Sequence, residues 1–276
     1  MGDYLRPRGL EEALQALTRP FMVLAGGTDF YPARVGRSVT EDILDIAGIA
    51  ALRGISETDA GWRLGATTTW SELIEAPLPP LFDGLKRAAR EVGGRQIQNA
   101  GTIAGNICNA SPAADGVPAL LALESEVELA RRDGVRRIPL SAFITGVRKT
   151  ELQPGELVVA LHVPRPGHDA RSAFLKLGAR RYLVISIAMA STVVEVEHGR
   201  VAAARVAVGA CSPVAQRLPA LEQALTGAPF DARLGERVAA SHLAPLSPID
   251  DVRGSAGYRS DAALVLLRRL LSTVAA

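Results

Sequence analysis

The amino-acid sequence predicts an α+β protein of two domains. Strand and helix candidates are mixed through the first part of the chain, whereas three long strand candidates and then three helix candidates fill the rest. The segment Pro164–Asp169, with the sequence PRPGHD, is rich in proline and glycine and marks the boundary. We therefore expect domains at residues 1–168 and 169–276, the first in two parts of about 1–55 and 56–168.

Hydrophobic periodicity places the elements of the first domain. Apolar residues at positions 10, 13, 14 and 17 repeat with a helical period, and short apolar runs bounded by turn residues predict strands. The dipeptide Asp133-Gly134 between two such runs is a strong hairpin signal. The predicted strands are Phe21–Ala25, Asp42–Ile46, Leu52–Ile55, Arg63–Ala66, Glu126–Ala130, Arg136–Leu140 and Leu157–Val163. The predicted helices are Leu10–Leu17, Trp70–Glu75, Leu81–Val92 and Ala114–Leu123, with a helical turn at Phe30–Val35.

The second domain is predicted to hold a three-stranded antiparallel sheet followed by helices. His198-Gly199 is a turn signal between the last two strands. The predicted strands are Ala173–Leu177, Ile185–Val196 and Val201–Ala210, and the predicted helices are Leu218–Leu225, Leu234–His242 and Ala256–Leu271. Apolar residues at 263, 264, 267, 270 and 271 give the last helix a stripe that faces a core.

The stretch Gly93–Ala119 shows neither the helical nor the strand period. Long segments of this kind in compact domains are binding loops or disordered, and the isoleucines spaced through this one need a core. We therefore expect an ordered binding loop. Gly101 and Gly105 would let its main chain approach a ligand closely, and exposed N–H groups in such a loop suit an anion. Asp115 either caps a helix or accepts a hydrogen bond from a ligand hydroxyl.

The stretch Gly93–Ala119 is the second of two glycine-rich segments in the chain. The first, Gly26-Gly27-Thr28-Asp29, follows the first predicted strand. A strand that runs into a Gly-Gly turn and a helix start is a common phosphate site, although a tight turn followed by an N-cap explains the same residues. The two glycine-rich segments together suit a ligand with a diphosphate. They indicate a dinucleotide such as FAD, bound without the G-x-G-x-x-G fingerprint, which the chain lacks.

Composition and motifs exclude several classes of function. A net charge of +2 is too small to argue for nucleic acid as a partner. Cys108 and Cys211 cannot alone hold an iron–sulfur cluster or a structural zinc, and the four histidines are scattered, so we expect no metal site. The cysteines form no disulfide framework, the N-terminus has no apolar signal core, and no apolar run of about 18 residues exists. We therefore expect a cytoplasmic protein with no membrane span. No nucleophile or acid–base pair is recognisable, so we expect no catalytic residue.

Segments spread over nearly the whole chain resemble one known family. They are AGGTD at 25–29, QIQNAGTIAGNICNASPAAD at 96–115, PALLAL at 118–123, FITGVRKTELQPGELVVALHVP at 143–164, FLKLGARR at 174–181 and DVRGSAGYR at 251–259. They are similar, in this order, to the FAD-binding medium subunits of the molybdenum hydroxylases, a group that includes carbon monoxide dehydrogenase and xanthine dehydrogenase. The resemblance implies a two-part α/β FAD-binding domain of the PCMH/vanillyl-alcohol-oxidase type. It also implies that the C-terminal α+β domain is of the CO dehydrogenase flavoprotein type.

The resemblance also implies which residues bind FAD. The diphosphate would lie between the two glycine-rich segments. Asp115 matches an Asp that binds ribose or ribityl hydroxyls, Val158 matches an aliphatic residue near the flavin or adenine, and Lys176 matches a Lys near the isoalloxazine. A cation there would stabilise reduced flavin; the less favoured alternative is that Lys176 is a strand residue whose charged end reaches solvent. The implied set is Ala25, Gly26, Gly27, Thr28, Asp29, Gly101, Thr102, Gly105, Asn106, Cys108, Asp115, Val158 and Lys176.

The chain departs from the family pattern at a few positions. Ala104 replaces a glycine, Gln98 stands where Arg or Lys is common, and Tyr31 stands where aliphatic residues are usual. We expect Cys108 to be a small buried loop residue rather than a covalent link to the flavin. We expect Tyr182 to pack at a core or an edge rather than to stack on the flavin.

The function that the resemblance implies is electron transfer. A large partner subunit would hold the molybdenum cofactor and hydroxylate the substrate, a small partner subunit would hold two [2Fe–2S] clusters, and FAD in this chain would reduce an external acceptor. A dimer of such heterotrimers is expected from the family. Two alternatives are a stand-alone flavin oxidoreductase of the same wider fold, which would need an acid–base residue, and a flavin-free interaction scaffold. The substrate and the acceptor are not encoded in this chain.

Overall fold

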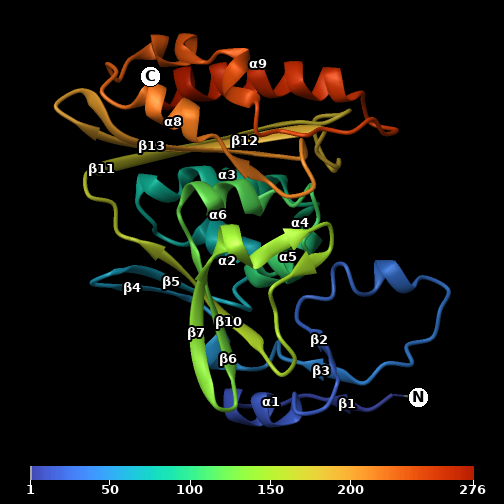
Figure 1. The fold of residues 1–276 in the computed structure, drawn as a ribbon. Coiled ribbons are helices and arrows are strands. Elements are labelled where there is room, and N and C mark those ends of the chain that lie inside the picture. Colours follow the sequence, from blue (N-terminus) through green and yellow to red (C-terminus); the bar gives the residue numbers. More distant parts are fainter. Residues whose placement is uncertain (1) are drawn as a thin grey trace.

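Three short parallel strands form the amino-terminal part of the fold (Figure 1). The computed structural model describes residues 2–276. The strands are β1 (Tyr4–Leu5), β2 (Met22–Leu24) and β3 (Ile43–Asp45), in the order β1-β3-β2, and the intervening segments hold α1 (Leu10–Ala16) and the 3₁₀ turn η1 (Pro32–Arg34). The predicted helix, strands and helical turn are confirmed. The sequence does not predict β1, because two residues are too few to show a period.

A five-stranded antiparallel sheet of order β4-β5-β10-β6-β7 forms the centre of the fold. Its strands are β4 (Ile55–Thr58), β5 (Gly61–Gly65), β6 (Glu126–Arg131), β7 (Gly134–Pro139) and β10 (Leu157–Pro164), preceded by the 3₁₀ turn η2 (Ala50–Leu52). The hairpin predicted at Asp133-Gly134 forms as β6 and β7. Strands β4 and β5 also pair as a hairpin, but β4 begins at Ile55, so the strand predicted at Leu52–Ile55 lies about three residues too early. On β10, Val158 and Leu161 belong to one core cluster while Leu157 and Val159 belong to another. Because both faces of β10 are buried, its sequence is almost continuously apolar.

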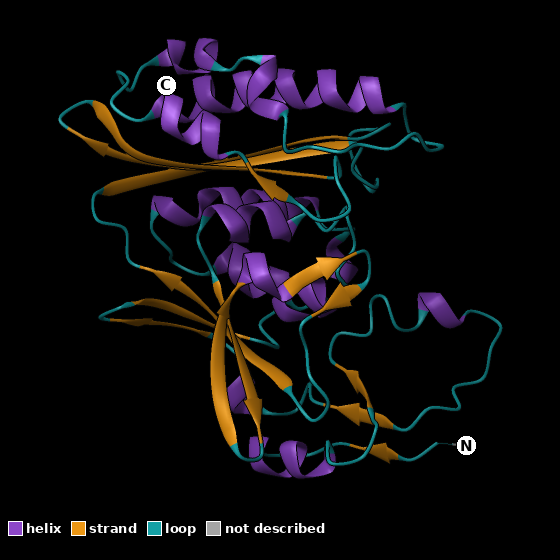
Figure 2. Cartoon of the chain, in the orientation of Figure 1, coloured by secondary structure: helices purple, strands orange, loops and turns teal. Residues whose placement is uncertain are grey.

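Short helices cover one face of this sheet (Figure 2). They are α2 (Trp70–Glu75), the 3₁₀ turn η3 (Pro80–Phe82), α3 (Asp83–Glu91), α6 (Gly116–Ala122) and α7 (Leu140–Phe143), with a small hairpin of β8 (Ile144–Gly146) and β9 (Lys149–Thr150) beside them. A capping box starts α2: the Thr69 hydroxyl accepts from the Glu72 N–H at 3.3 Å, and the Glu72 carboxylate accepts from the Thr69 N–H at 2.8 Å.

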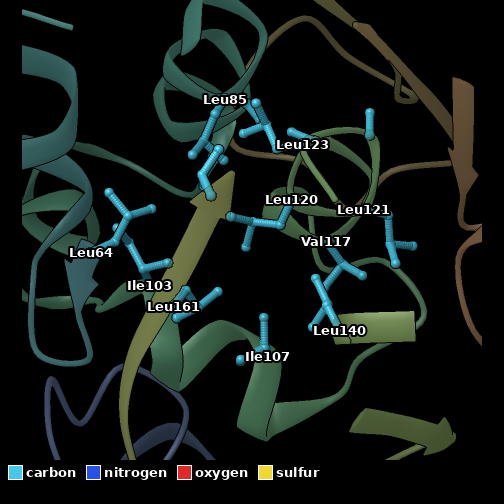
Figure 3. Close-up of a cluster of buried hydrophobic side chains, with 14 of the residues drawn as sticks. Leu64, Leu85, Ile103, Ile107, Val117, Leu120, Leu121, Leu123, Leu140 and Leu161 are labelled. Carbon is cyan, nitrogen blue, oxygen red and sulfur yellow. The ribbon is translucent and has the colours of Figure 1, made fainter. Parts of the chain in front are cut away.

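The stretch Gly93–Ala119 is largely helical, so the prediction of a segment without helix or strand is wrong. It contains α4 (Arg95–Ala100), α5 (Ile103–Asn109) and the start of α6. Helices this short show no clear apolar period, and isolated they would be unstable. Tertiary packing stabilises them, since Ile103 and Ile107 of α5 are fully buried in the main core (Figure 3).

The C-terminal sheet has four antiparallel strands, where the sequence predicts three. They are β11 (Asp169–Leu177), β12 (Ala188–Glu197), β13 (Arg200–Gly209) and β14 (Gln216–Arg217), in chain order. The additional strand β14 is too short to produce an alternating pattern. Helices α8 (Pro219–Leu225) and α9 (Ala256–Val274) cover the outer face of the sheet (Figure 1).

Two 3₁₀ segments, η4 (Ala232–Arg237) and η5 (Ala240–Leu243), stand where the sequence predicts the helix Leu234–His242. This segment packs closely on α9: a Cβ added to Gly235 would lie 2.1 Å from the carbonyl oxygen of Arg268. The prediction of an α-helix here is therefore wrong, because contact with α9 decides the path of the chain.

Helices α3 and α6 lie between the two antiparallel sheets (Figure 1). One core cluster crosses this layer and includes Leu161 of β10, Leu120 of α6 and Met189 of β12. Figure 3 shows side chains of β10, α5 and α6 meeting in this cluster. The two sheets are thus joined through a shared core rather than a flexible linker alone. Among residues 2–276, no helix is long and apolar enough to cross a membrane.

Candidate cofactor site

The first glycine-rich segment lies at the carboxyl end of β2, where ligands commonly bind in parallel sheets. Gly27 has a φ of +70°, a left-handed conformation that favours glycine. Within the described residues, the main-chain N–H groups of residues 26–29 donate to no carbonyl or side chain. Four consecutive N–H groups without a protein acceptor suit an anion such as phosphate.

The second segment lies directly against the first. A Cβ added to Gly26 would be 1.9 Å from the carbonyl oxygen of Ala100, and one added to Gly101 would be 3.4 Å from the Thr28 hydroxyl. Gly26 therefore allows the two segments to approach each other, whereas the close contact of a Cβ at Gly101 would be with the Ile97 carbonyl oxygen of its own segment, at 2.9 Å. The sequence predicts that Gly101 makes room for a ligand, but in the structure it makes room for neighbouring protein atoms.

The N–H groups at the start of α5 are already used by the protein. Thr102 caps this helix, and its hydroxyl accepts from the Gly105 N–H at 3.1 Å. The N–H groups of Ile103 and Ala104 donate to the carbonyls of Thr68 and Ala66, at 3.0 and 3.3 Å. The free main-chain donors of the candidate site therefore lie on the first segment, and the second contributes side chains.

Asn106 carries an unsatisfied polar atom in this region. Its side-chain carbonyl oxygen is buried and has no hydrogen-bond partner among residues 2–276. A buried acceptor without a partner is costly in a folded protein and usually indicates a missing ligand or water. The Asn106 amide therefore fits a ligand that offers a hydrogen-bond donor.

Cys108, one turn further along α5 than Gly105, is exposed to solvent, so the expectation of a buried residue is wrong. Surrounding protein atoms nevertheless raise the pKa of its thiol to about 12. Such a thiol stays protonated at neutral pH and is a poor nucleophile. This favours a role in lining the site over a covalent link.

A chain of hydrogen bonds joins the first segment to the end of α5. The Asn109 amide donates to the Asp29 carboxylate at 2.7 Å. The Arg148 guanidinium donates to both the main-chain and side-chain oxygens of Asn109, and the Arg148 N–H donates to the Ala110 carbonyl at 2.9 Å. The sequence gives no signal for Arg148, which reaches the site only because the β8–β9 hairpin folds against α5.

Asp115 and Lys176 form a buried ion pair, although they are predicted separately as cofactor residues. The Lys176 ammonium donates to one carboxylate oxygen of Asp115 at 2.7 Å, and the Ser186 hydroxyl donates to the other at 2.5 Å. The side chains of Lys176 and Asp115 are only 5% and 9% exposed. Burial raises the pKa of the Asp115 carboxyl above its usual value, and Lys176 and Ser186 offset part of this rise.

The structure does not support the two alternative roles, in which Asp115 caps a helix and Lys176 extends into solvent. Asp115 precedes α6 at the N-cap position, but its side chain makes no capping hydrogen bond. Lys176 does not extend into solvent; its ammonium also donates to the Glu91 carbonyl at 3.3 Å. Both charges face the boundary between α6 and the C-terminal sheet.

Three further residues from the sequence analysis are Val158, Ala25 and Tyr182. Val158 is buried in the main core cluster with Ile103 and Ile107, which brings β10 beside α5. Ala25 continues directly from β2 into the first segment. Tyr182, on the loop between β11 and β12, is 48% exposed, so it does not pack in a core.

Two surface cavities lie elsewhere, each of about 540 Å³. One is beside α1 and the β6–β7 hairpin, and the other lies between α6 and β14. No predicted cofactor residue lines either cavity. The candidate site is therefore marked by unpaired hydrogen-bonding groups and by buried charge.

Two family models match the chain in succession. Residues 1–166 match the FAD binding domain in molybdopterin dehydrogenase, and residues 173–274 match the CO dehydrogenase flavoprotein C-terminal domain.

Individual proteins match over nearly the full length. The xanthine dehydrogenase FAD-binding subunit of Escherichia coli O157:H7 is 31% identical, over 99% of this chain and 96% of the relative. The carbon monoxide dehydrogenase medium chain of Hydrogenophaga pseudoflava is 29% identical, over 98% and 96%. The structure of reconstituted CO dehydrogenase from Oligotropha carboxidovorans superposes with a TM-score of 0.90 at 28% identity, covering 100% of this chain and 98% of that one.

Proposed function

The chain belongs to the family of FAD-binding medium subunits of the molybdenum hydroxylases, and from this premise we propose that it holds the FAD diphosphate on the N–H groups of residues 26–29. The observation that carries this proposal is the run of four consecutive N–H groups without a protein acceptor. A diphosphate is the part of FAD that needs such donors. The unpaired Asn106 acceptor fits the same ligand, which carries hydroxyl and ring N–H donors.

We assign the other residues by what their groups can do. Thr28 and Thr102 lie beside the diphosphate, and Cys108 lines the site without reacting. The Asp115 carboxylate accepts from ribityl or ribose hydroxyls, since each of its oxygens already has one donor and can accept another.

Lys176 is proposed to place a positive charge near the flavin. The ammonium is held by Asp115 and the Glu91 carbonyl, so its position is fixed before a ligand arrives. FAD, when bound, supplies the electron-transfer chemistry of the subunit. A fixed cation next to it would favour negative charge on the ring system.

We further propose the partner subunits, the domain boundary and the cellular location of the chain. It associates with a small [2Fe–2S] subunit and a large molybdenum-cofactor subunit, as a dimer of heterotrimers, and divides into domains at residue 168. The medium-chain relatives support the multi-subunit arrangement. A cytoplasmic location is supported by the two free cysteines, which suit a reducing compartment.

The test is a titration of the full-length apoprotein with FAD, followed by the visible flavin spectrum and by quenching of flavin fluorescence. Thr28→Asp places a negative charge beside the proposed diphosphate position and is expected to weaken FAD binding at least about tenfold. Thr28→Val, of the same shape but uncharged, is the matched control and should bind nearly as well as the wild type. Equal affinity of Thr28→Asp and the wild type would refute the diphosphate assignment, and a wild-type chain that binds no FAD would refute the function.

A further inference from the structure

The orientation of Asp115 is set by the C-terminal half of the chain rather than by its own helix. Its carboxylate makes no hydrogen bond to the first turn of α6. One carboxylate oxygen accepts a hydrogen bond from Lys176 of β11. The other accepts one from Ser186, the last but one residue of the loop between β11 and β12. Two donors on two oxygens fix the plane of the carboxylate, which one donor alone would leave free to rotate.

Ser186 differs from Lys176 in what it offers to a ligand. Ser186 is 2% exposed, and the single proton of its hydroxyl is donated to Asp115 at 2.5 Å. It carries no charge, and it is not among the residues that the family resemblance marks. Its one hydrogen-bond donor therefore acts on Asp115 rather than on a ligand.

The main chain beside Ser186 is held by the segment DVRGSAGYR, which the proposed FAD contacts do not use. Arg259 from this segment is 3% exposed, and its guanidinium donates to the Ile187 carbonyl at 2.6 Å and to the Ala210 carbonyl at 3.0 Å. Asp251 from the same segment accepts from Arg259 at 2.6 Å. From the other side, the Ile187 N–H donates to the Leu177 carbonyl at 2.8 Å.

These contacts make a continuous path from the start of α9 to the candidate site. Arg259 fixes Ile187, the adjacent Ser186 fixes one oxygen of Asp115, and Lys176 fixes the other. Apart from the peptide bond between Ser186 and Ile187, each step is a hydrogen bond or an ion pair between buried groups, which have few alternative partners.

We propose that Ser186 is a positioning residue of the cofactor site, which orients the Asp115 carboxylate for the ribityl or ribose hydroxyls of FAD, and that Arg259 fixes Ser186 through the main chain of Ile187. The inference rests on the proposed role of Asp115 in binding FAD. It gives the segment 251–259 a role in the cofactor site, although no residue of that segment is assigned a contact with FAD.

Removal of the Ser186 hydroxyl is expected to weaken FAD binding. The hydrogen bond from Ser186 already exists in the chain without FAD, so its loss weakens binding because a freed Asp115 carboxylate must be ordered when FAD binds. Ordering one side chain changes a dissociation constant by about two- to tenfold, and Ser186→Ala is expected to raise the dissociation constant for FAD by that factor. It should also shift the midpoint potential of the bound flavin, because the Asp115–Lys176 pair next to the ligand loses one of its two anchors.

The experiment compares three variants of the full-length chain. Ser186→Ala lacks the hydroxyl, Ser186→Thr keeps it and should restore affinity and potential, and Ser191→Ala is the matched control. Ser191 is also a buried serine, 1% exposed, but its hydroxyl donates at 3.1 Å to the main-chain carbonyl of Ala173 and not to the site. FAD affinity, the flavin midpoint potential and the melting temperature of each apoprotein are measured.

Each outcome decides one question. Weaker binding and a shifted potential in Ser186→Ala alone support positioning. Equal FAD affinity and potential in Ser186→Ala and the wild type overturn the inference while leaving FAD binding intact. Equal losses in Ser186→Ala and Ser191→Ala, matched by equal drops in melting temperature, also overturn it, because a general loss of stability would then be the cause. A wild-type chain that binds no FAD would instead refute the proposed function.

Discussion

Replacement of Lys176 by methionine tests whether Asp115 and Lys176 form a buried ion pair that stabilises the folded chain. Methionine keeps much of the length and apolar character of the lysine side chain but removes its charge. Both side chains of the pair are almost inaccessible, at 5% and 9% exposure. Breaking such a pair leaves a buried charge uncompensated, so Lys176→Met is expected to lower the free energy of unfolding of the apoprotein by about 3–5 kcal/mol.

The dependence of this loss on pH has a definite sign. Burial already raises the pKa of Asp115 in the folded chain, and Lys176 counteracts the rise. In Lys176→Met the pKa of Asp115 in the folded chain rises further above its value in the unfolded chain. At pH values between these two pKa values, folded Asp115 keeps a proton that unfolded Asp115 has released. The stability of the variant therefore falls as pH rises through this window, and the loss should be smaller near about pH 5 than near about pH 8.

Urea unfolding at several pH values measures both effects. Arg95→Met is the matched control, because the Arg95–Glu75 pair is about two-thirds exposed on both sides (63% and 64%) and should cost less than about 1 kcal/mol. A double variant with Asp115→Asn should recover part of the loss, since it removes the unpaired charge. A loss below about 1 kcal/mol for Lys176→Met, or a loss that does not change with pH, would contradict a buried ion pair in the folded chain.

Three further predictions concern single positions. Thr69→Ala removes the cap of α2 and should lower the free energy of unfolding by about 1 kcal/mol, seen as a fall in the thermal melting temperature; an unchanged melting temperature would contradict the capping box. Gly26→Ala should destabilise the chain and prevent FAD binding, because its Cβ would lie 1.9 Å from the Ala100 carbonyl oxygen, whereas Gly9→Ala, in open space, should bind FAD like the wild type. Cys108 should react with a thiol reagent at neutral pH far more slowly than a free cysteine, despite its exposure, because its pKa is about 12; a rate equal to that of free cysteine would refute the raised pKa.

The sequence predicts most of the strands and the longer helices, because their signals are local. The hairpin at Asp133-Gly134 and the apolar stripe of the last helix are each visible within a window of some twenty residues. Local patterns fail where elements are very short, as for β1 and β14, or where a neighbour determines the backbone, as for the 3₁₀ segments packed on α9.

The second glycine-rich segment shows the same limit. Its composition of Gly, Asn and Thr favours a loop, yet it folds as α4 and α5 because Ile103 and Ile107 are buried and Thr102 caps a helix. Local propensity differences are a fraction of a kcal/mol per residue, and the burial of two isoleucines outweighs them.

By itself, the sequence determined the two glycine-rich segments, the α+β class and the family to which the chain belongs. Only the tertiary structure decided which residues meet at the candidate site. Asp115 contacts Lys176 and Ser186 across 61 and 71 residues of sequence, and Asn109 contacts Asp29 across 80. No periodic pattern encodes such contacts, because they arise when separate cores pack together and bring side chains from distant strands and helices to one boundary.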